Sequence, residues 1–408
     1  MRSRRRKTYI QSVDEDSRVI GGMAPWWRNR EECGHRKRRT KRCDGAEGAE
    51  KRLLNKGDAG QDYALYRSSN DAKQRACRSA MPPKFLSTYV PLVVFPAISA
   101  AALKLIFGSF VASGLDQELR LQCPTALSES MPYRLEYLGL PAVDGTLCAL
   151  VAFFHLAFTP AVRPLLTYFF STSIPLLALP ALEAVHSGRP AILALPVLLG
   201  LAGQMFTVGA TLPLYWLLFI LSGAAQARPA AEASQSTMIS TAHVQAVSFG
   251  IIVGAGAPSL FPVWQFIAQM GHLIVRPPPK SGAAANGFGW VQALYVASFI
   301  VGSSIHLGTL AAATSWRDVF LPSLEPRVGV APELKVLDFL QWDCFFGFSS
   351  TLLATLWFAR TASQALTIAL WNVLGSVIVG PGATIAAVAL WRESYLHTQI
   401  SDAAKKSE

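Results

Sequence analysis

The sequence contains few charged residues for its length. Only 15% of its 408 residues are Asp, Glu, Lys or Arg, whereas soluble domains carry about 25%. Apolar residues make up 51% of the chain, and the mean hydropathy is +0.31. This deficit argues against an ordinary soluble domain and indicates that lipid is the solvent for most of the chain.

Motifs of several enzyme classes are also missing. No D-D-x-x-D, N-D-x-x-D or D-x-D-D string could hold magnesium against a diphosphate, and the His boxes of membrane desaturases are absent. The sequence has no G-x-G-x-x-G nucleotide motif and no G-x-S-x-G nucleophile motif. An enzyme of this sequence is therefore expected to use acid–base chemistry without a cofactor or a metal.

Cysteine is scarce, and no C-x-x-C pair occurs among the six cysteines. Cys33, His35 and Cys43 lack a fourth ligand at a standard metal-site spacing. Cys148 and Cys344 fall in apolar runs, so we expect both to be buried free thiols that pack as small hydrophobic side chains.

The charge that is present is concentrated at the N-terminus. Residues 1–80 contain 21 of the 37 basic and 11 of the 26 acidic residues, a net charge of +10, which leaves +1 for residues 81–408. This basic leader has no apolar run long enough for a signal peptide, and its composition predicts disorder. It is interpreted as a disordered cytosolic tail, as an unused upstream extension with Met81 as the initiator, or as a nuclear or nucleic-acid signal. Because the rest of the chain is almost neutral, nucleic acid is not expected as a partner.

The remainder predicts an all-α, polytopic membrane bundle of about eight helices. The predicted domains are the leader at 1–80, a transmembrane domain at 81–395 and a cytosolic tail at 396–408. The expected spans are 88–113, 140–160, 163–183, 190–222, 243–275, 289–313, 336–359 and 364–391.

Two of these spans, 190–222 and 243–275, are too long to be straight. About 33 residues extend roughly 50 Å as a helix, against a hydrocarbon core of about 30 Å. Breaks are expected at Pro196 and Pro213 in the first. In the second span, breaks are expected at Gly254, Gly256 and Pro258.

Basic residues near both termini place both ends in the cytosol, and the acidic loop 114–139 then lies in the lumen. The endoplasmic reticulum is the expected membrane.

Carboxylates at apolar positions are the candidate functional groups, because ionisable residues inside a membrane are costly. Asp144 follows a proline at the start of the second span, and Asp343 lies deep in the seventh among aromatic residues. Glu136 is a reserve acid. Asp338 is expected to cap its helix. Glu183 adjoins His186 and Arg189, and a surface role is expected for it.

Aromatic residues surround these acids. Trp342 and Phe346 flank Asp343, and Trp264 and Gln265 lie together in the fifth span. An acid kept protonated in an apolar site can donate a proton, and ring faces can stabilise a developing carbocation. We therefore expect Trp264, Gln265, Trp342 and Phe346 to contact a substrate.

The sequence MPYRLEYLGLPAVD at 131–144, followed by LCALVAFFH at 147–155, resembles a fungal family of secondary-metabolite membrane proteins. This family comprises membrane-bound terpene cyclases of the ascofuranone and ascochlorin type and membrane epoxide hydrolases of the aurovertin and citreoviridin type. The acidic seventh span and the length from Met81 support the resemblance, which covers about residues 85–395.

The resemblance implies acid-initiated opening of an epoxide on a small hydrophobic polyprenyl or polyene substrate, with cyclisation or hydrolysis. We interpret Asp144 and Asp343 as an acid–base pair, one protonating the epoxide oxygen and the other orienting the nucleophile. The expected topology separates them unless 190–222 folds as two half-spans. A proton-coupled transporter or exporter of a hydrophobic metabolite is the alternative, because buried carboxylates also serve as proton relays.

Overall fold

The computed structural model describes residues 88–123, 133, 137–186, 189–225, 239–256, 287–313 and 315–407. The chain divides into two units, Met1–Ser79 and Ala80–Glu408, and all of these residues belong to the second. Helices make up the secondary structure of this part of the chain, which contains no β-strand. The all-α class expected from the sequence is therefore confirmed for these residues.

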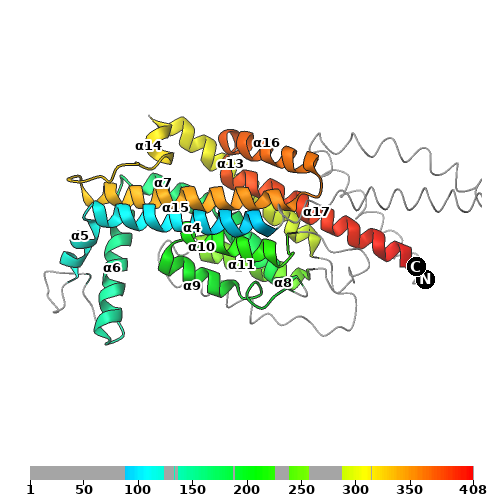
Figure 1. Cartoon of the computed structure of the whole chain (residues 1–408), viewed down its shortest axis with the longest axis horizontal. Coiled ribbons are helices and arrows are strands. Elements are labelled where there is room, and N and C mark those ends of the chain that lie inside the picture. Colours follow the sequence, from blue (N-terminus) through cyan, green and yellow to red (C-terminus); the bar gives the residue numbers. More distant parts are fainter. Residues whose placement is uncertain are drawn as a thin grey trace, which may run out of the picture. The chain divides into compact units, whose positions relative to one another are not determined.

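Figure 1 shows the helices of the described residues in chain order. They are α4 (Val90–Ala112), α5 (Leu115–Gln122), α6 (Pro141–Ala157), α7 (Arg163–Thr172), α8 (Ile174–Val185), α9 (Pro196–Phe206), α10 (Val208–Leu221), α11 (Thr241–Gly256), α13 (Phe288–Ala312), α14 (Trp316–Phe320), α15 (Pro332–Thr355), α16 (Ala362–Ile378) and α17 (Pro381–Ser407).

Within the described ranges, three helical stretches are long and apolar enough to cross a membrane. They are α4, the consecutive helices α7 and α8 taken as Arg163–Val185, and α13. The eight spans expected from the sequence are not found, because several apolar runs form shorter helices instead. α6, α9, α10 and α16 are apolar helices of 10–17 residues. A membrane protein is supported, with fewer full spans than hydropathy predicts.

The long run 190–222 is broken, as its length requires: the helix begins only at Pro196, as predicted, and a second break lies away from Pro213. α9 ends at Phe206, α10 begins at Val208, and Thr207 between them has a φ of 71°. Pro196 starts α9, and Pro213 lies inside α10. We call α9 and α10 the half-helices and Thr207 their tip.

Two other expected spans also differ from the structure. The run 364–391 is divided into α16 and α17 at Gly380, whose φ is 90°. A Cβ there would lie 2.7 Å from Cγ of His306, so the close approach to α13 requires glycine. α17 continues past residue 395, the expected end of the transmembrane domain. Of 243–275, α11 covers only the first part, and Pro258 lies outside the described residues.

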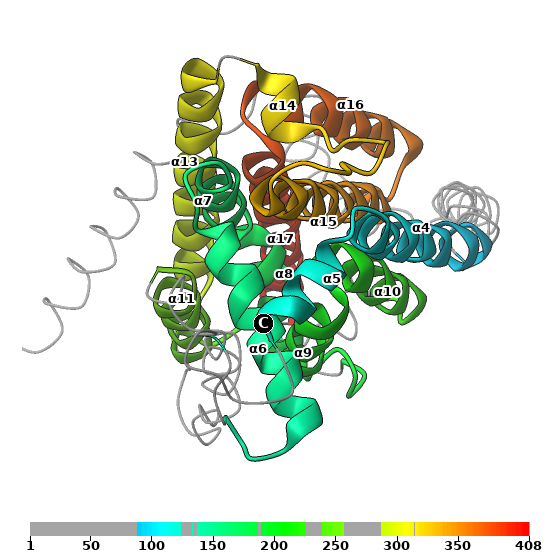
Figure 2. The ribbon, with the colours of Figure 1, turned by 90° about the vertical axis from the view of Figure 1, so that its left-hand side faces the viewer.

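α15 is the central element of the packing. It lies beside α4 in both views (Figures 1 and 2), and the two are antiparallel. Ser109 Oγ donates to Asp338 Oδ2 at one end, and the rings of Phe95 and Trp357 lie 5.6 Å apart at the other. α10 runs parallel to α15, because Gly209 contacts Asp343 and, seven residues later, Trp216 donates to Thr351. α6 crosses the direction of α4 and α15 (Figure 1).

A disulfide joins Cys123 at the end of α5 to Cys148 in α6. The expectation that Cys148 is a free thiol is therefore wrong, whereas Cys344 is free and buried as expected. Sequence spacing gave no sign of the bond, since 25 residues separate the two cysteines. The bond fixes α6 to α5 at the end of α4 that carries Ser109. We call this the disulfide end of the bundle.

Loss of the disulfide is expected to destabilise the protein. Closing a loop of 25 residues restricts the unfolded chain, which corresponds to about 3 kcal/mol. A Cys123→Ser/Cys148→Ser variant should lose about this much unfolding free energy, measured by denaturant unfolding in detergent. Reductant should destabilise the wild type and a Cys344→Ala control but leave the double variant unchanged. An equal effect of reductant on all three proteins would contradict the prediction.

Candidate functional site

The tip of the half-helices is half-buried and conformationally strained. Thr207 is the only non-glycine residue with a positive φ among those described. A β-branched side chain disfavours this conformation, which costs about 1–3 kcal/mol and is often found at functional sites. α10 also begins here, so its first N–H groups have no partner within the helix. The tip therefore needs hydrogen-bond acceptors from elsewhere.

Asp343 supplies such an acceptor. Asp343 is 6% exposed. It follows the first residue of α15, Pro332, by eleven residues, which is about 16 Å along the helix. The backbone N–H of Gly209 donates to Asp343 Oδ1 at 2.5 Å. A Cβ on Gly209 would lie 2.8 Å from the carbonyl oxygen and 2.9 Å from Oδ1 of Asp343. Glycine thus allows the acid to reach the N-terminus of α10, whose dipole stabilises a negative charge.

Aromatic side chains lie next to this acid, as the sequence predicted. Trp342 and Phe346 are buried and stacked with ring centroids 5.6 Å apart, and Phe345 is 45% exposed. The indole N–H of Trp342 is already used, since it donates to the carbonyl of Ser323. The two predicted contacts Trp342 and Phe346 therefore accompany Asp343. The other two, Trp264 and Gln265, lie outside the described residues.

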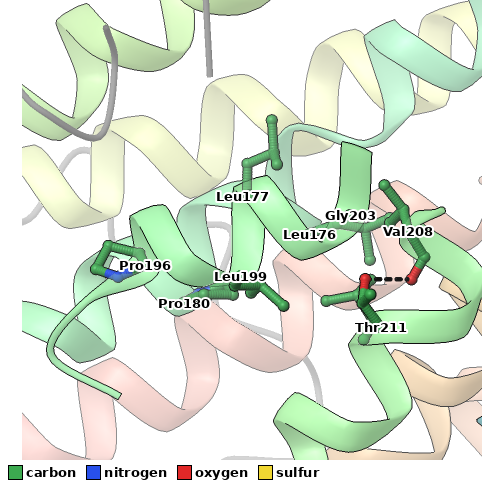
Figure 3. A pocket seen from close by; sticks show the side chains of 10 residues that line it. Leu176, Leu177, Pro180, Pro196, Leu199, Gly203, Val208 and Thr211 are labelled. Atoms are coloured by element: carbon green, nitrogen blue, oxygen red, sulfur yellow. Dashed lines mark hydrogen bonds between the residues drawn. The ribbon is translucent and has the colours of Figure 1, made fainter. Parts of the chain in front are cut away.

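A small apolar hollow adjoins the other side of the tip (Figure 3). Its free volume of about 30 Å³ corresponds to about one water molecule. It is lined by Leu176, Leu177, Pro180, Pro196, Leu199, Gly200, Gly203, Val208, Thr211 and Leu212. The Thr211 hydroxyl donates to the carbonyl of Thr207 at 2.8 Å, which places a polar group at the tip end of the hollow.

Asp144 and Asp343 are not brought together. Asp144 lies in the first turn of α6, where it accepts a hydrogen bond from the Leu138 N–H at 2.8 Å. The contact of α6 with α15 is made nine residues later, where the rings of Phe153 and Phe339 lie 5.1 Å apart. That spacing is about 13 Å of helix. The reserve acid Glu136 lies outside the described residues.

Asp338 also has a role other than the expected helix cap. Its carboxylate accepts from the Ser323 N–H at 2.7 Å and from Ser109 on α4, and Arg327 lies 3.8 Å away. It therefore holds the chain before α15 against α4, and it does not cap its own helix.

A second group of ionisable side chains forms at the opposite end from the disulfide. Glu183 is 1% exposed, and Arg189 and Arg392 bind its two carboxylate oxygens. Arg392 also donates to Glu393 at 2.9 Å, and His186 lies 3.6 Å from Glu393. We call these five residues the Glu183 cluster. The surface role expected for Glu183 is therefore wrong.

The cluster could not be assembled from sequence, because Arg392 follows Glu183 by 209 residues. One feature of the sequence could have indicated the pair: Glu183 and Arg392 each lie at the end of an apolar run and close to another ionisable residue. Aromatic rings hold the arginine in place, since its guanidinium lies 4.8 Å from the ring centroid of Phe358 and 5.5 Å from that of Phe219.

The cluster also contains the one candidate metal-ligand set found among the described residues. Single ligand atoms of Glu183, His186 and Glu393 lie within 4.8 Å of one another. Arg189 and Arg392 already occupy both oxygens of Glu183. A divalent cation would have to displace an arginine and would add positive charge beside two guanidinium groups. The residues present therefore do not fit a metal ion.

Comparison with known families gives one match. A family model, the CtvD domain of a citreoviridin biosynthesis-related family, matches residues 90–275. No curated protein and no solved structure matches the chain. The match points to secondary-metabolite biosynthesis, in agreement with the sequence resemblance at this level. It includes Glu183 and the half-helices, whereas Asp343 and Arg392 follow it.

Replacing the tip residue by glycine should relieve strain. Thr207→Gly removes a backbone strain of about 1–3 kcal/mol from the folded protein. Glycine also increases the entropy of the unfolded chain, which costs about 0.5–1 kcal/mol of stability. The free energy of unfolding should therefore rise by about 1 kcal/mol. Thr367→Gly, at an exposed position inside α16, is the matched control and should lower it by about 0.5 kcal/mol. Denaturant unfolding measures both. Equal losses in the two variants would show that the tip is not strained.

The Glu183 cluster should make stability depend on pH through His186. Burial opposes protonation, but Glu183 and Glu393 outweigh it, so the pKa of the His186 imidazole is raised. A raised folded pKa stabilises the protein below about pH 6.5, and this stabilisation is lost as pH rises through the folded value. The melting temperature should therefore fall between about pH 6 and pH 8, and less so in His186→Gln.

His397→Gln is the control for this experiment. Burial lowers the pKa of the His397 imidazole, so its contribution to the pH dependence has the opposite sign. A decline of the same size in wild type and His186→Gln would exclude His186 as its source.

Proposed function

We propose that the chain is a membrane enzyme of secondary-metabolite biosynthesis that opens an epoxide on a hydrophobic polyene or polyprenyl substrate. The observation that carries this proposal is the position of Asp343. A buried carboxyl group lies within the bundle, beside stacked aromatic rings and at the strained tip of two half-helices. The family match supports biosynthesis as the setting.

In this mechanism Asp343 is the general acid. Its protonated carboxyl group transfers the proton to the epoxide oxygen as the C–O bond breaks, so the oxygen leaves as a hydroxyl group. The carboxylate that remains is stabilised by the Gly209 N–H and the N-terminus of α10. The geometry thus favours the charged product of the proton transfer.

The carbon that loses the C–O bond develops positive charge. The faces of Trp342 and Phe346 can stabilise it while the apolar surroundings exclude bulk water. Water, an internal hydroxyl group or an alkene then forms the new bond, and the proton released returns to Asp343. Water gives hydrolysis, and an internal group gives cyclisation. Neither step requires a cofactor.

Substrate binding requires movement of the half-helices. The hollow beside the tip has room for about one water, and α8, α9 and α10 provide all of its lining. A polyene would fit only after α9 and α10 separate from α8. Lipid on the exposed side of α9, where Leu198, Leu201 and Met205 are at least 49% exposed, provides a route for a hydrophobic substrate.

The second candidate function is proton-coupled transport of a hydrophobic metabolite. Transporters often form their sites where two discontinuous helices meet, and the half-helices meet at Thr207. Asp343 would then bind and release a proton between conformations. Uptake into vesicles with no chemical change in the substrate would favour this function.

We place the protein in the endoplasmic reticulum membrane with the disulfide end in the lumen. Disulfides persist in oxidising compartments, and the lumen is one of them. The acidic character of 114–139 leads to the same orientation.

Removing the acid should abolish conversion. In microsomes supplied with an epoxidised polyene, Asp343→Asn should lower the rate of epoxide loss about 100-fold or more, because it removes the proton donor. Asp144→Asn is the matched control, since Asp144 accepts from Leu138 and is held by a different helix. Product formation is followed by mass spectrometry at equal protein levels. Conversion by Asp343→Asn at the wild-type rate would remove Asp343 from the mechanism.

A further inference from the structure

The Glu183 cluster has more hydrogen-bond donors than acceptors. Both carboxylate oxygens of Glu183 bind arginines, and Arg392 further donates to Glu393 and to the carbonyl of Ala224. The Nε atoms of Arg189 and Arg392 are buried and have no hydrogen-bond partner in the described part of the chain. The carboxylates of the cluster are thus already paired with arginines, whereas some guanidinium N–H groups have no acceptor.

Two tyrosines add further hydrogen-bond donors that have no acceptor. Tyr215 on α10 and Tyr295 on α13 are 5% and 1% exposed, and neither hydroxyl has a hydrogen-bond partner among the described residues. Both interact electrostatically with Glu183 and Arg392. Four helices, α8, α10, α13 and α17, therefore direct polar groups toward one buried region.

Such a set of unpartnered groups in one buried region calls for an explanation, because the large majority of buried side-chain polar atoms are hydrogen-bonded. Leaving a donor unsatisfied costs about 1–3 kcal/mol. Arg189 and Arg392 balance Glu183 and Glu393 in formal charge, but their remaining N–H groups have no acceptor among the described residues. The missing component is a hydrogen-bond acceptor, and anionic oxygens are the strongest acceptors for guanidinium groups.

We propose that the Glu183 cluster, with Tyr215 and Tyr295, binds an oxyanion of the phosphate or carboxylate class. An oxyanion of this class offers several acceptor oxygens, and these match the guanidinium N–H groups of Arg189 and Arg392. The tyrosine hydroxyls donate to the remaining oxygens. This site is separate from the proposed epoxide chemistry at Asp343.

Two sources supply this chemistry. The cluster lies at the end of the bundle away from the disulfide, where α8 ends and the chain leaves α10. A phospholipid headgroup and a free phosphate or carboxylate present the same oxygens. The experiment therefore uses inorganic phosphate in one arm and nanodiscs with or without phosphatidic acid in phosphatidylcholine in the other.

The test is the melting temperature of the purified full-length protein, followed by tryptophan fluorescence. Phosphate, compared with chloride at the same ionic strength, or phosphatidic acid, compared with phosphatidylcholine alone, should raise it by about 3 °C or more. A shift with only one of them identifies the source. No shift in either arm overturns the proposal.

The variants Tyr215→Phe and Tyr295→Phe isolate the site. Each removes one unpartnered hydroxyl and little else, so each should melt at or above the wild-type temperature without the anion. Each should lose most of the shift that the anion causes. Tyr133→Phe, whose ring lies near His155 in the region of α6, is the matched control and should keep the full shift.

A full shift in both tyrosine variants overturns the proposal. Should one variant fail to fold, the other and the conservative Arg189→Lys variant, which keeps the charge and loses the guanidinium fork, provide the same comparison. The activity of Asp343 variants does not enter this measurement, so failure here leaves the epoxide proposal unaffected.

Discussion

A helix that begins inside an apolar bundle has backbone N–H groups that no solvent can satisfy. α10 begins in this way at Val208, and the Asp343 carboxylate accepts one of these groups through Gly209. The register between α10 and α15, the strained tip and the position of the hollow all depend on this interaction. The Asp343 carboxyl group thus stabilises the start of α10, and it is also the group proposed to transfer a proton.

The two ends of the bundle differ in chemistry. The disulfide end is held by a covalent bond, by carboxylates that accept from backbone N–H groups, such as Asp144 and Asp338, and by the ion pair of Lys335 with Glu118. The other end is held by ion pairs between buried side chains centred on Glu183 and Arg392. Removing charges from water costs several kcal/mol per ion, so this end is stable only because each carboxylate has close partners.

The sequence predicted some features because they depend on local properties. Low charge and long apolar runs indicated a helical membrane protein, and the length of 190–222 required a break. The aromatic setting of Asp343 was visible in neighbouring residues. The break itself lies at Thr207 because Gly209 and Asp343 meet there, a tertiary contact between residues 134 apart. Neither Pro196 nor Pro213 predicts the break at Thr207.

Other features could not be read from neighbours in sequence. Glu183, His186 and Arg189 are close in sequence and polar, which is typical of a surface. In the structure Arg392 pairs with Glu183, and the rings of Phe219 and Phe358 lie against the Arg392 guanidinium. Cys123 and Cys148 belong to a short helix and an apolar one that only packing brings together. Asp144 and Asp343 looked like a pair because both are acids in apolar sequence, but their helices hold them apart.

The distance in sequence between Glu183 and Arg392 has a consequence for synthesis of the chain. Glu183 enters the membrane early, whereas Arg392 is made only with the last helix. Until then the carboxylate lacks its main counter-ion, and a chain that stops short of α17 retains an uncompensated buried charge. The buried environment of Glu183 is therefore complete only after α17 has packed against α8, so the last helix of the described chain closes the bundle.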